Sequence, residues 1–255
     1  MDPLIGQLLT PEYVLGTVAL SYVISLFGSL LALLCAKRMV RSDGSLDFGM
    51  LTAASVALGG IGIWSMHFIG MVAYRLPVSI TYDLPLTVIS LVAAIVISGL
   101  ALYLTGGKRF NIKGWAAGSL LAGLGVCVMH YMGMFAMSLR ATMSLDPGTV
   151  AGSVAIAIVA AAAALWLAFN LTELMHQMIA AAVMGVAVCA MHYVGMTAAR
   201  MVCTAPIAPS PLSFGGSNIG LGVFGIAGAV LIVILWAVTG RALDAKPTAM
   251  RTRAR

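Results

Sequence analysis

The sequence predicts an all-α membrane protein with seven transmembrane helices, and three observations carry this prediction. The chain is 61% apolar and only 9% charged, whereas about a quarter of the residues in a soluble domain are charged. Apolar runs of the roughly 20 residues that cross a bilayer recur along its whole length. A short pattern centred on a Met-His pair occurs three times at nearly equal intervals, which marks an internal repeat.

The apolar runs define the expected helices in chain order. They cover residues 13–35, 48–74, 83–105, 114–138, 148–170, 177–201 and 217–240. Each run is apolar on every side, which is typical of a helix in lipid. Helices and closed barrels are the only structures that span a bilayer, and barrel strands would be about ten residues long with alternating polarity. Asp2 and the lack of a basic segment before the first run argue against a cleaved signal peptide.

The distribution of Lys and Arg predicts the orientation of the bundle, because short loops rich in these residues stay cytoplasmic. Basic residues gather in the first and third connections and in the tail: Lys37, Arg38, Arg41, Lys108, Arg109, Lys113, Arg241, Lys246, Arg251, Arg253 and Arg255. On the other side, single arginines occur at Arg75, Arg140 and Arg200. We therefore expect the N-terminus outside and the C-terminus in the cytoplasm. The net charge of +6 follows from this orientation and requires no nucleic-acid partner.

The repeated pattern consists of a glycine, five further residues, and then Met-His-aromatic-x-Gly-Met. Its three copies are Gly60–Met71, Gly123–Met134 and Gly185–Met196, and their histidines are 63 and 62 residues apart. Each copy falls near the outer end of the second helix of a hairpin. The chain is therefore expected to be one domain, 1–255, made of three tandem two-helix repeats (about 13–75, 83–140 and 148–201) and a seventh helix at 217–240.

Three parallel hairpins place His67, His130 and His192 at one depth, in the outer half of the membrane, and permit a pseudo-threefold axis along the membrane normal. Two arrangements are then open. The histidines either converge on one shared site or form a separate site in each repeat. The first helices of the hairpins offer no comparable polar groups and are expected to be packing partners.

Helical spacing sorts the remaining motif residues into two stripes. The methionine four residues after each histidine lies on the histidine face, whereas the one before it lies on a stripe of small residues that is typical of a packing seam. Imidazole and thioether ligands suit copper, above all Cu(I), and the motifs contain no carboxylate for a di-iron site. The candidate metal ligands are His67, His130, His192, Met71, Met134, Met196, Met66, Met129 and Met191, with Cys127, Cys189, Tyr131 and Tyr193 as secondary candidates. For Met66, Met129 and Met191, packing and ligation are both open.

The segments Met66-His67-Phe68, Met129-His130-Tyr131 and Met191-His192-Tyr193-Val194-Gly195-Met196-Thr197 resemble the repeats of the MHYT domain, a bacterial integral membrane sensor module. The resemblance covers about residues 10–240. It implies copper bound through the Met and His residues and the sensing of oxygen, carbon monoxide or nitric oxide. The chain departs from the family pattern in two ways. Phe68 stands where tyrosine is common, and the namesake threonine occurs only as Thr197.

The expected function is that of a multi-pass protein of the bacterial inner membrane that senses a diatomic gas or redox state through copper. The resemblance implies a cytoplasmic signalling partner, such as a domain that makes or degrades cyclic di-GMP. No catalytic signature occurs in the 255 residues, so a non-enzymatic sensor is expected. Two alternatives stay open: a membrane protein that handles or delivers copper, and a haem- or copper-dependent oxidoreductase. Whether the chain is a stand-alone module or part of a longer protein also stays open.

Overall fold

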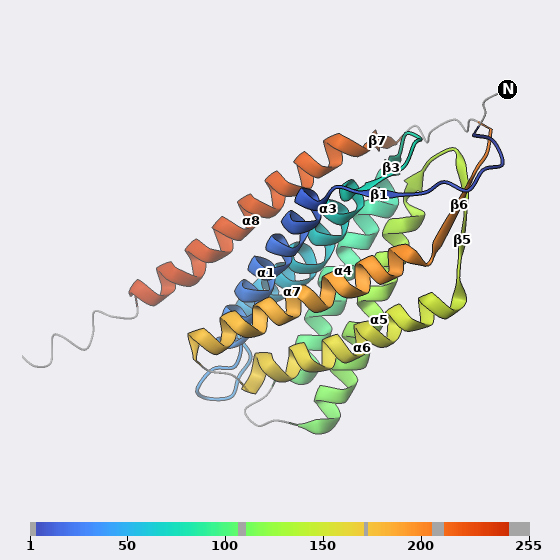
Figure 1. Ribbon diagram of the computed structural model, residues 1–255. Coiled ribbons are helices and arrows are strands. Elements are labelled where there is room, and N and C mark those ends of the chain that lie inside the picture. Colours follow the sequence, from blue (N-terminus) through green and yellow to red (C-terminus); the bar gives the residue numbers. More distant parts are fainter. Residues whose placement is uncertain (1–3, 107–110, 171–172, 206–211, 245–255) are drawn as a thin grey trace, which may run out of the picture.

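The computed structural model describes residues 4–106, 111–170, 173–205 and 212–244 as a bundle of long helices with a small cap of strands at one end (Figure 1). Seven helical segments in this part of the chain are long and apolar enough to cross a membrane. They are α1 (Leu15–Ala36), a second span made of α2 (Phe48–Ser55), η1 (Val56–Ser65) and α3 (Met66–Ala73), α4 (Leu84–Thr105), α5 (Ile112–Phe135), α6 (Pro147–Asn170), α7 (Leu174–Thr197) and α8 (Gly216–Asp244). The seven predicted helices are confirmed, with ends that differ by no more than four residues.

The second span departs from the uniform α-helix that the sequence predicts. Its middle part, η1, is a π-helix of ten residues, in which backbone hydrogen bonds run to the fifth residue rather than the fourth. The hydroxyl of Ser65 also donates to the carbonyl of Gly60, five residues back, at 2.8 Å. The wider turn changes the position of Gly60 and Trp64 relative to His67. The spacing of 3.6 residues per turn, by which the motif residues were sorted into stripes, therefore does not hold in this segment.

Six of the spans form a closed ring. The second span, α5 and α7 carry the motifs, and we call them the motif helices. Each of the other three packs in a groove between two motif helices: α1 between the second span and α7, α4 between the second span and α5, and α6 between α5 and α7. The last helix, α8, lies outside the ring and packs against α3, η1 and α1 (Figure 1). The second span is the most buried of the seven, because it touches both ring neighbours and α8.

Short antiparallel strands close the end of each helix pair that carries the motif. A strand before the first helix pairs with a strand after the second: β1 (Glu12–Tyr13) with β2 (Tyr74–Arg75), β3 (Thr81–Asp83) with β4 (Met137–Ser138), and β5 (Ala141–Leu145) with β6 (Ala199–Cys203). A seventh strand, β7 (Ser213–Gly215), pairs with the free edge of β3. These strands were not predicted from the sequence. We call this end of the bundle the strand end.

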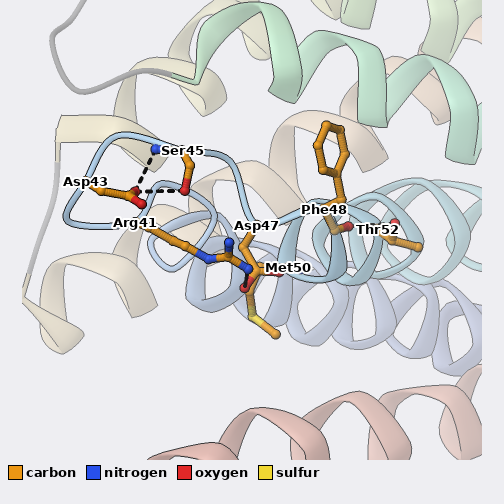
Figure 2. Close-up of polar contacts among 7 residues, drawn as sticks. All are labelled: Arg41, Asp43, Ser45, Asp47, Phe48, Met50 and Thr52. Atoms are coloured by element: carbon orange, nitrogen blue, oxygen red, sulfur yellow. Dashed lines mark hydrogen bonds and ion pairs between the residues drawn. The ribbon is translucent and has the colours of Figure 1, made fainter.

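The opposite end carries an ordered loop between α1 and α2 (Figure 2). Arg41 forms an ion pair with Asp47 at 3.0 Å, and Asp47 caps α2 by accepting a hydrogen bond from the Met50 N–H. The Met50 N–H and the Arg41 guanidinium both lower the pKa of Asp47. Asp43 accepts hydrogen bonds from the N–H and the hydroxyl of Ser45. This loop contains one of the basic clusters on which the predicted orientation rests.

The two groups of basic residues lie at opposite ends of the bundle. Arg75 and Arg200 lie in strands and Arg140 lies beside β5, whereas Arg41 and Lys113 lie at the far end. Several residues that entered the prediction lie outside the described residues: Lys108, Arg109, Lys246, Arg251, Arg253 and Arg255. The structure thus has the charge asymmetry that the sequence predicts, and the orientation itself stays a prediction.

Labelling of single cysteines tests that orientation. Ser79, between β2 and β3, and Ser42, in the loop of Figure 2, are both exposed and lie at opposite ends. With the strand end outside, an impermeant maleimide should label Ser79→Cys in intact cells, and Ser42→Cys only after permeabilisation. The parent protein is the blank, because three of its four cysteines are buried. The reverse labelling pattern would show that the strand end faces the cytoplasm.

Candidate metal centre

The three motif histidines meet at the axis of the bundle, next to the strand end. His67, His130 and His192 lie five or six residues before the ends of α3, α5 and α7, so the three helices present them at one level. All three are 0% exposed. Their Nδ1 atoms form a nearly equilateral triangle: 3.1 Å from His67 to His192, 3.2 Å from His67 to His130, and 3.2 Å from His130 to His192. The histidines therefore converge, which is the first of the two arrangements left open by the sequence. We call this group the histidine triad.

The three rings are arranged like the blades of a propeller. Their centroids are 4.9–5.1 Å apart and their planes are nearly perpendicular, at 85–88°. The Nδ1 atoms are much closer together than the centroids, so the Nδ1 edges of the rings face the axis. A point equidistant from the three Nδ1 atoms in their plane lies about 1.8 Å from each, close to the ~2.0 Å of a bond between zinc and a histidine nitrogen. The spacing suits three ligands of one small cation.

The other edge of each ring rests on a glycine of the next copy. The Nε2 edge of His67 lies against Gly133, that of His130 against Gly195, and that of His192 against Gly70, so the contacts run once around the axis. A Cβ at any of these glycines would collide with the imidazole. None of the three Nε2 atoms has a hydrogen-bond partner in the described part of the chain. The glycine three residues after each histidine therefore provides space for the imidazole of another copy, and we call it a glycine seat. Steric contact with this glycine orients the ring.

The aromatic residue that follows each histidine packs on it edge to face. The ring centroids of these neighbours are 4.7–4.9 Å apart in all three copies. In two copies the aromatic residue is a tyrosine that shares a hydrogen bond with a serine of an adjacent helix: Tyr193 with Ser21 at 2.9 Å, and Tyr131 with Ser153 at 2.8 Å. The secondary candidates Tyr131 and Tyr193 thus contact the triad through their rings and join the motif helices to α1 and α6 through their hydroxyls.

The first copy makes the equivalent link with a different residue. Phe68 has no hydroxyl, and the indole N–H of Trp64 donates instead to Ser90 of α4 at 2.9 Å. Ser21, Ser90 and Ser153 occupy equivalent positions, because each also donates to the carbonyl three residues before it. The first helices, expected to be packing partners, thus also form hydrogen bonds to the motif helices through these serines. Each of these serines lies six residues after the first residue of its helix, and this shared position was the signal that could have found them.

The candidate sulfur ligands are buried, apart from Cys189. All six methionines are at most 1% exposed: Met66, Met71, Met129, Met134, Met191 and Met196. Met71, Met129, Met134 and Met196 belong to the apolar core of the strand end, whereas Met191 packs with Cys127. Cys127 is buried and Cys189 is half-buried, and both are free thiols. The structure thus brings the three histidines together in a ligand geometry, and ligation by the sulfur atoms stays a prediction.

A bundle of seven spans with three buried histidines on its axis defines a helical membrane protein with a candidate metal centre. The model of the MHYT family, described as a bacterial signalling protein N-terminal repeat, matches residues 60–118, 123–181 and 185–253, and the chain belongs to this family. The resemblance inferred from the sequence is thereby confirmed. Each matched repeat begins at the first glycine of a motif. The matched repeats therefore begin and end at other residues than the predicted two-helix hairpins, and the division into hairpins stays a prediction.

Several curated relatives are signalling proteins. The chain is 39% identical, over 72% of its length and 27% of the relative, to the bifunctional diguanylate cyclase/cyclic di-GMP phosphodiesterase MucR of Pseudomonas aeruginosa. It is 38% identical, over 62% of its length and 21% of the relative, to the cyclic di-GMP phosphodiesterase NbdA of the same organism. It is 29% identical to the signaling protein YkoW of Bacillus subtilis, over 71% of its length and 23% of the relative. The chain thus spans about a quarter of the length of these relatives. No solved structure matches it.

The glycine seats can be tested by adding one methyl group. Gly133→Ala places a Cβ against the His67 imidazole, so we expect a loss of about 1–3 kcal/mol in stability through overpacking. Thermal unfolding in detergent measures the effect. Gly152→Ala on α6 is the matched control, because a Cβ there meets open space. Equal melting temperatures for the two variants would show that the glycine is not a steric seat.

Proposed function

We propose that this chain is a copper-binding sensor of the bacterial inner membrane, which responds to a diatomic gas or to redox state and signals to a cytoplasmic output. The observation that carries the proposal is the histidine triad: three fully buried imidazoles with their Nδ1 atoms 3.1–3.2 Å apart. Membership of a family of bacterial signalling repeats supports the sensor role. The names of the relatives support an output linked to cyclic di-GMP.

The number of protons in the triad favours a bound cation. Three neutral imidazoles carry three N–H protons for six ring nitrogens. A proton on one Nδ1 can bridge only one neighbouring Nδ1 well, so the triangle alone cannot satisfy all three atoms. All three Nδ1 lone pairs are used at once when they point at a cation and the protons lie on Nε2. A buried polar atom left unsatisfied costs about 1–3 kcal/mol, so a cation that satisfies all three Nδ1 atoms at once, including the one that the proton cannot reach, stabilises the fold.

The surrounding donors favour copper over other cations. Imidazole suits copper, zinc, iron and nickel alike, but thioethers select Cu(I). The six buried motif methionines lie within about one turn of a histidine. Within the described residues, the triad is the one group of three or more His, Cys, Asp or Glu side chains placed to share an ion, and it contains no carboxylate. When bound, copper would supply a redox-active Lewis acid with a position open to a small ligand.

The chain itself provides an enclosed and rigid site. The strand cap lies next to the triad, and the aromatic residues Phe68, Tyr131 and Tyr193 pack against its rings. Metal-bound histidines usually donate their second N–H to a carboxylate or carbonyl, which fixes the orientation of the ring. Here that partner is lacking in the described structure, and the glycine seats hold the rings instead. Such steric control keeps the three Nδ1 atoms together without a nearby charge.

The geometry also bears on the two alternative functions. A haem held between two of these histidines would need more space than Nδ1 atoms 3.1–3.2 Å apart provide. A copper transporter needs polar or thiol groups along a path through the membrane. On the side away from the strand end, the described residues that line the space next to the triad are all Ala, Val, Leu, Ile or Met. Both observations favour the sensor.

A structural change at the triad could reach the last helix, α8, through a direct contact. α3, which carries His67, packs against α8, and a Cβ at Gly220 of α8 would contact the side chain of Val72. α8 then runs to the end opposite the strands (Figure 1). A shift of α3 on ligand binding would therefore act directly on the last helix. The output that receives this shift is either a further domain or a separate protein.

The copper content of histidine variants tests the shared centre. We expect about one copper ion per chain, and His67→Ala, His130→Ala and His192→Ala should each lose most of it, because two nitrogens of three make a poor site. Elemental analysis of the purified protein measures this. His176→Ala is the control, because His176 lies outside the triad, beside Glu173 at 3.4 Å. A loss of about one third in each triad variant would instead indicate three independent sites.

A further inference from the structure

An apolar cavity of about 60 Å³ lies inside the helix ring, on the side of the triad away from the strands. All six ring spans contribute to its lining. Its end nearest the triad is formed by Ile63, Val126 and Val188, each four residues before a histidine, and we call these three residues the collar. Met191, which directly precedes His192, also lines the cavity. The cavity therefore ends within one helical turn of the histidine triad.

Alanines account for the open space. Five of them lie on one face of α6: Ala157, Ala160, Ala161, Ala164 and Ala168. The other ring helices add alanines such as Ala32, Ala101 and Ala187. Interiors are normally packed with few voids larger than a water molecule. Here five of the six ring spans place alanines along the cavity, and a void remains that larger apolar residues would fill.

The chemistry of the lining decides what the cavity can hold. None of the described residues that line the cavity carries a polar side chain, so a water molecule inside would lack the two to four polar partners that it needs. The volume is several times the roughly 10–15 Å³ that one water-sized molecule requires. Apolar cavities of this kind stay dry and bind apolar guests such as xenon. Molecules of two atoms fit in a volume of about 60 Å³.

We propose that this cavity binds a diatomic gas such as oxygen, carbon monoxide or nitric oxide and delivers it to the triad past the collar. The delivery role rests on the proposed function, whereas the binding of a small apolar guest does not. Diatomic gases are apolar and dissolve in the hydrocarbon core, so a gas site inside the bundle is supplied from the membrane. The cavity raises the local concentration of the gas within one turn of the histidines.

Xenon tests the cavity without copper or gas. Crystals of the metal-free protein under xenon pressure should show an anomalous peak between Ala161 and the collar. Ala161→Leu, which fills the cavity, should abolish the peak. Ala163→Leu adds the same side chain to the exposed face of the same helix and should retain it. Parent crystals with no xenon there, or with a lipid chain in its place, would overturn the proposal.

The rate of gas binding tests the delivery step. After flash photolysis of the copper(I) protein under carbon monoxide, rebinding should slow severalfold in Ala161→Leu and stay at the parent rate in Ala163→Leu. Ala164→Leu is a second filling variant in case the first unfolds, and melting temperature and copper content confirm that each variant is intact. An unchanged rebinding rate in folded, copper-loaded filling variants would overturn delivery through the cavity. If the parent binds no copper, the proposed function fails while the xenon result still decides on the cavity.

Discussion

The structure depends on the close contact between each imidazole and the glycine of the next copy. Three helices can bring their histidines to one axis only if each neighbouring backbone leaves room for the ring, and a single Cβ at Gly70, Gly133 or Gly195 would remove that room. Small residues allow such close approach in membranes. Because each contact joins one copy to the next, the three together close the ring. They also place α3, α5 and α7 at one level, where the flanking strands can pair.

The first copy keeps this arrangement with different residues. The loss of the tyrosine hydroxyl, the tryptophan one turn earlier and the π-helix are related changes. Phe68 lacks the hydroxyl that Tyr131 and Tyr193 use, and Trp64 donates to the equivalent serine from one turn earlier. Trp64 lies in the π-helix η1, whose wide turn has no counterpart in α5 or α7. π-helical segments often occur at functional sites. The departures of the first copy from the motif therefore preserve the link to the adjacent helix.

The sequence predicted those features that rest on long or repeated patterns. The seven spans followed from apolar runs, and the common depth of the histidines followed from their spacing. Convergence of the histidines was one of two arrangements that the sequence left open. Other features rest on contacts between distant residues, which no single-chain pattern reveals. The glycines were assigned to a packing seam between helices. Only the structure shows that histidine rings pack against them. The strands were missed because segments of two to five residues are too short to show alternation. The π-helix was missed because its sequence is as apolar as that of an α-helix.

The first copy of the motif, whose span contains the π-helix, is the copy that packs against α8. Its position therefore bears on how a change at the triad could reach an output. The ring is closed and nearly threefold, so a change at its centre would by itself have no preferred direction. α8 breaks that equivalence, because it packs against α3, η1 and α1 and, among the motif helices, touches the second span most closely. That span carries His67 and also contains the π-helix, whose hydrogen-bond pattern differs from that of its neighbours. A rearrangement of the triad would therefore pass to α8 mainly through the first copy, so we expect the departures of that copy from the motif to matter for the output as well as for the site.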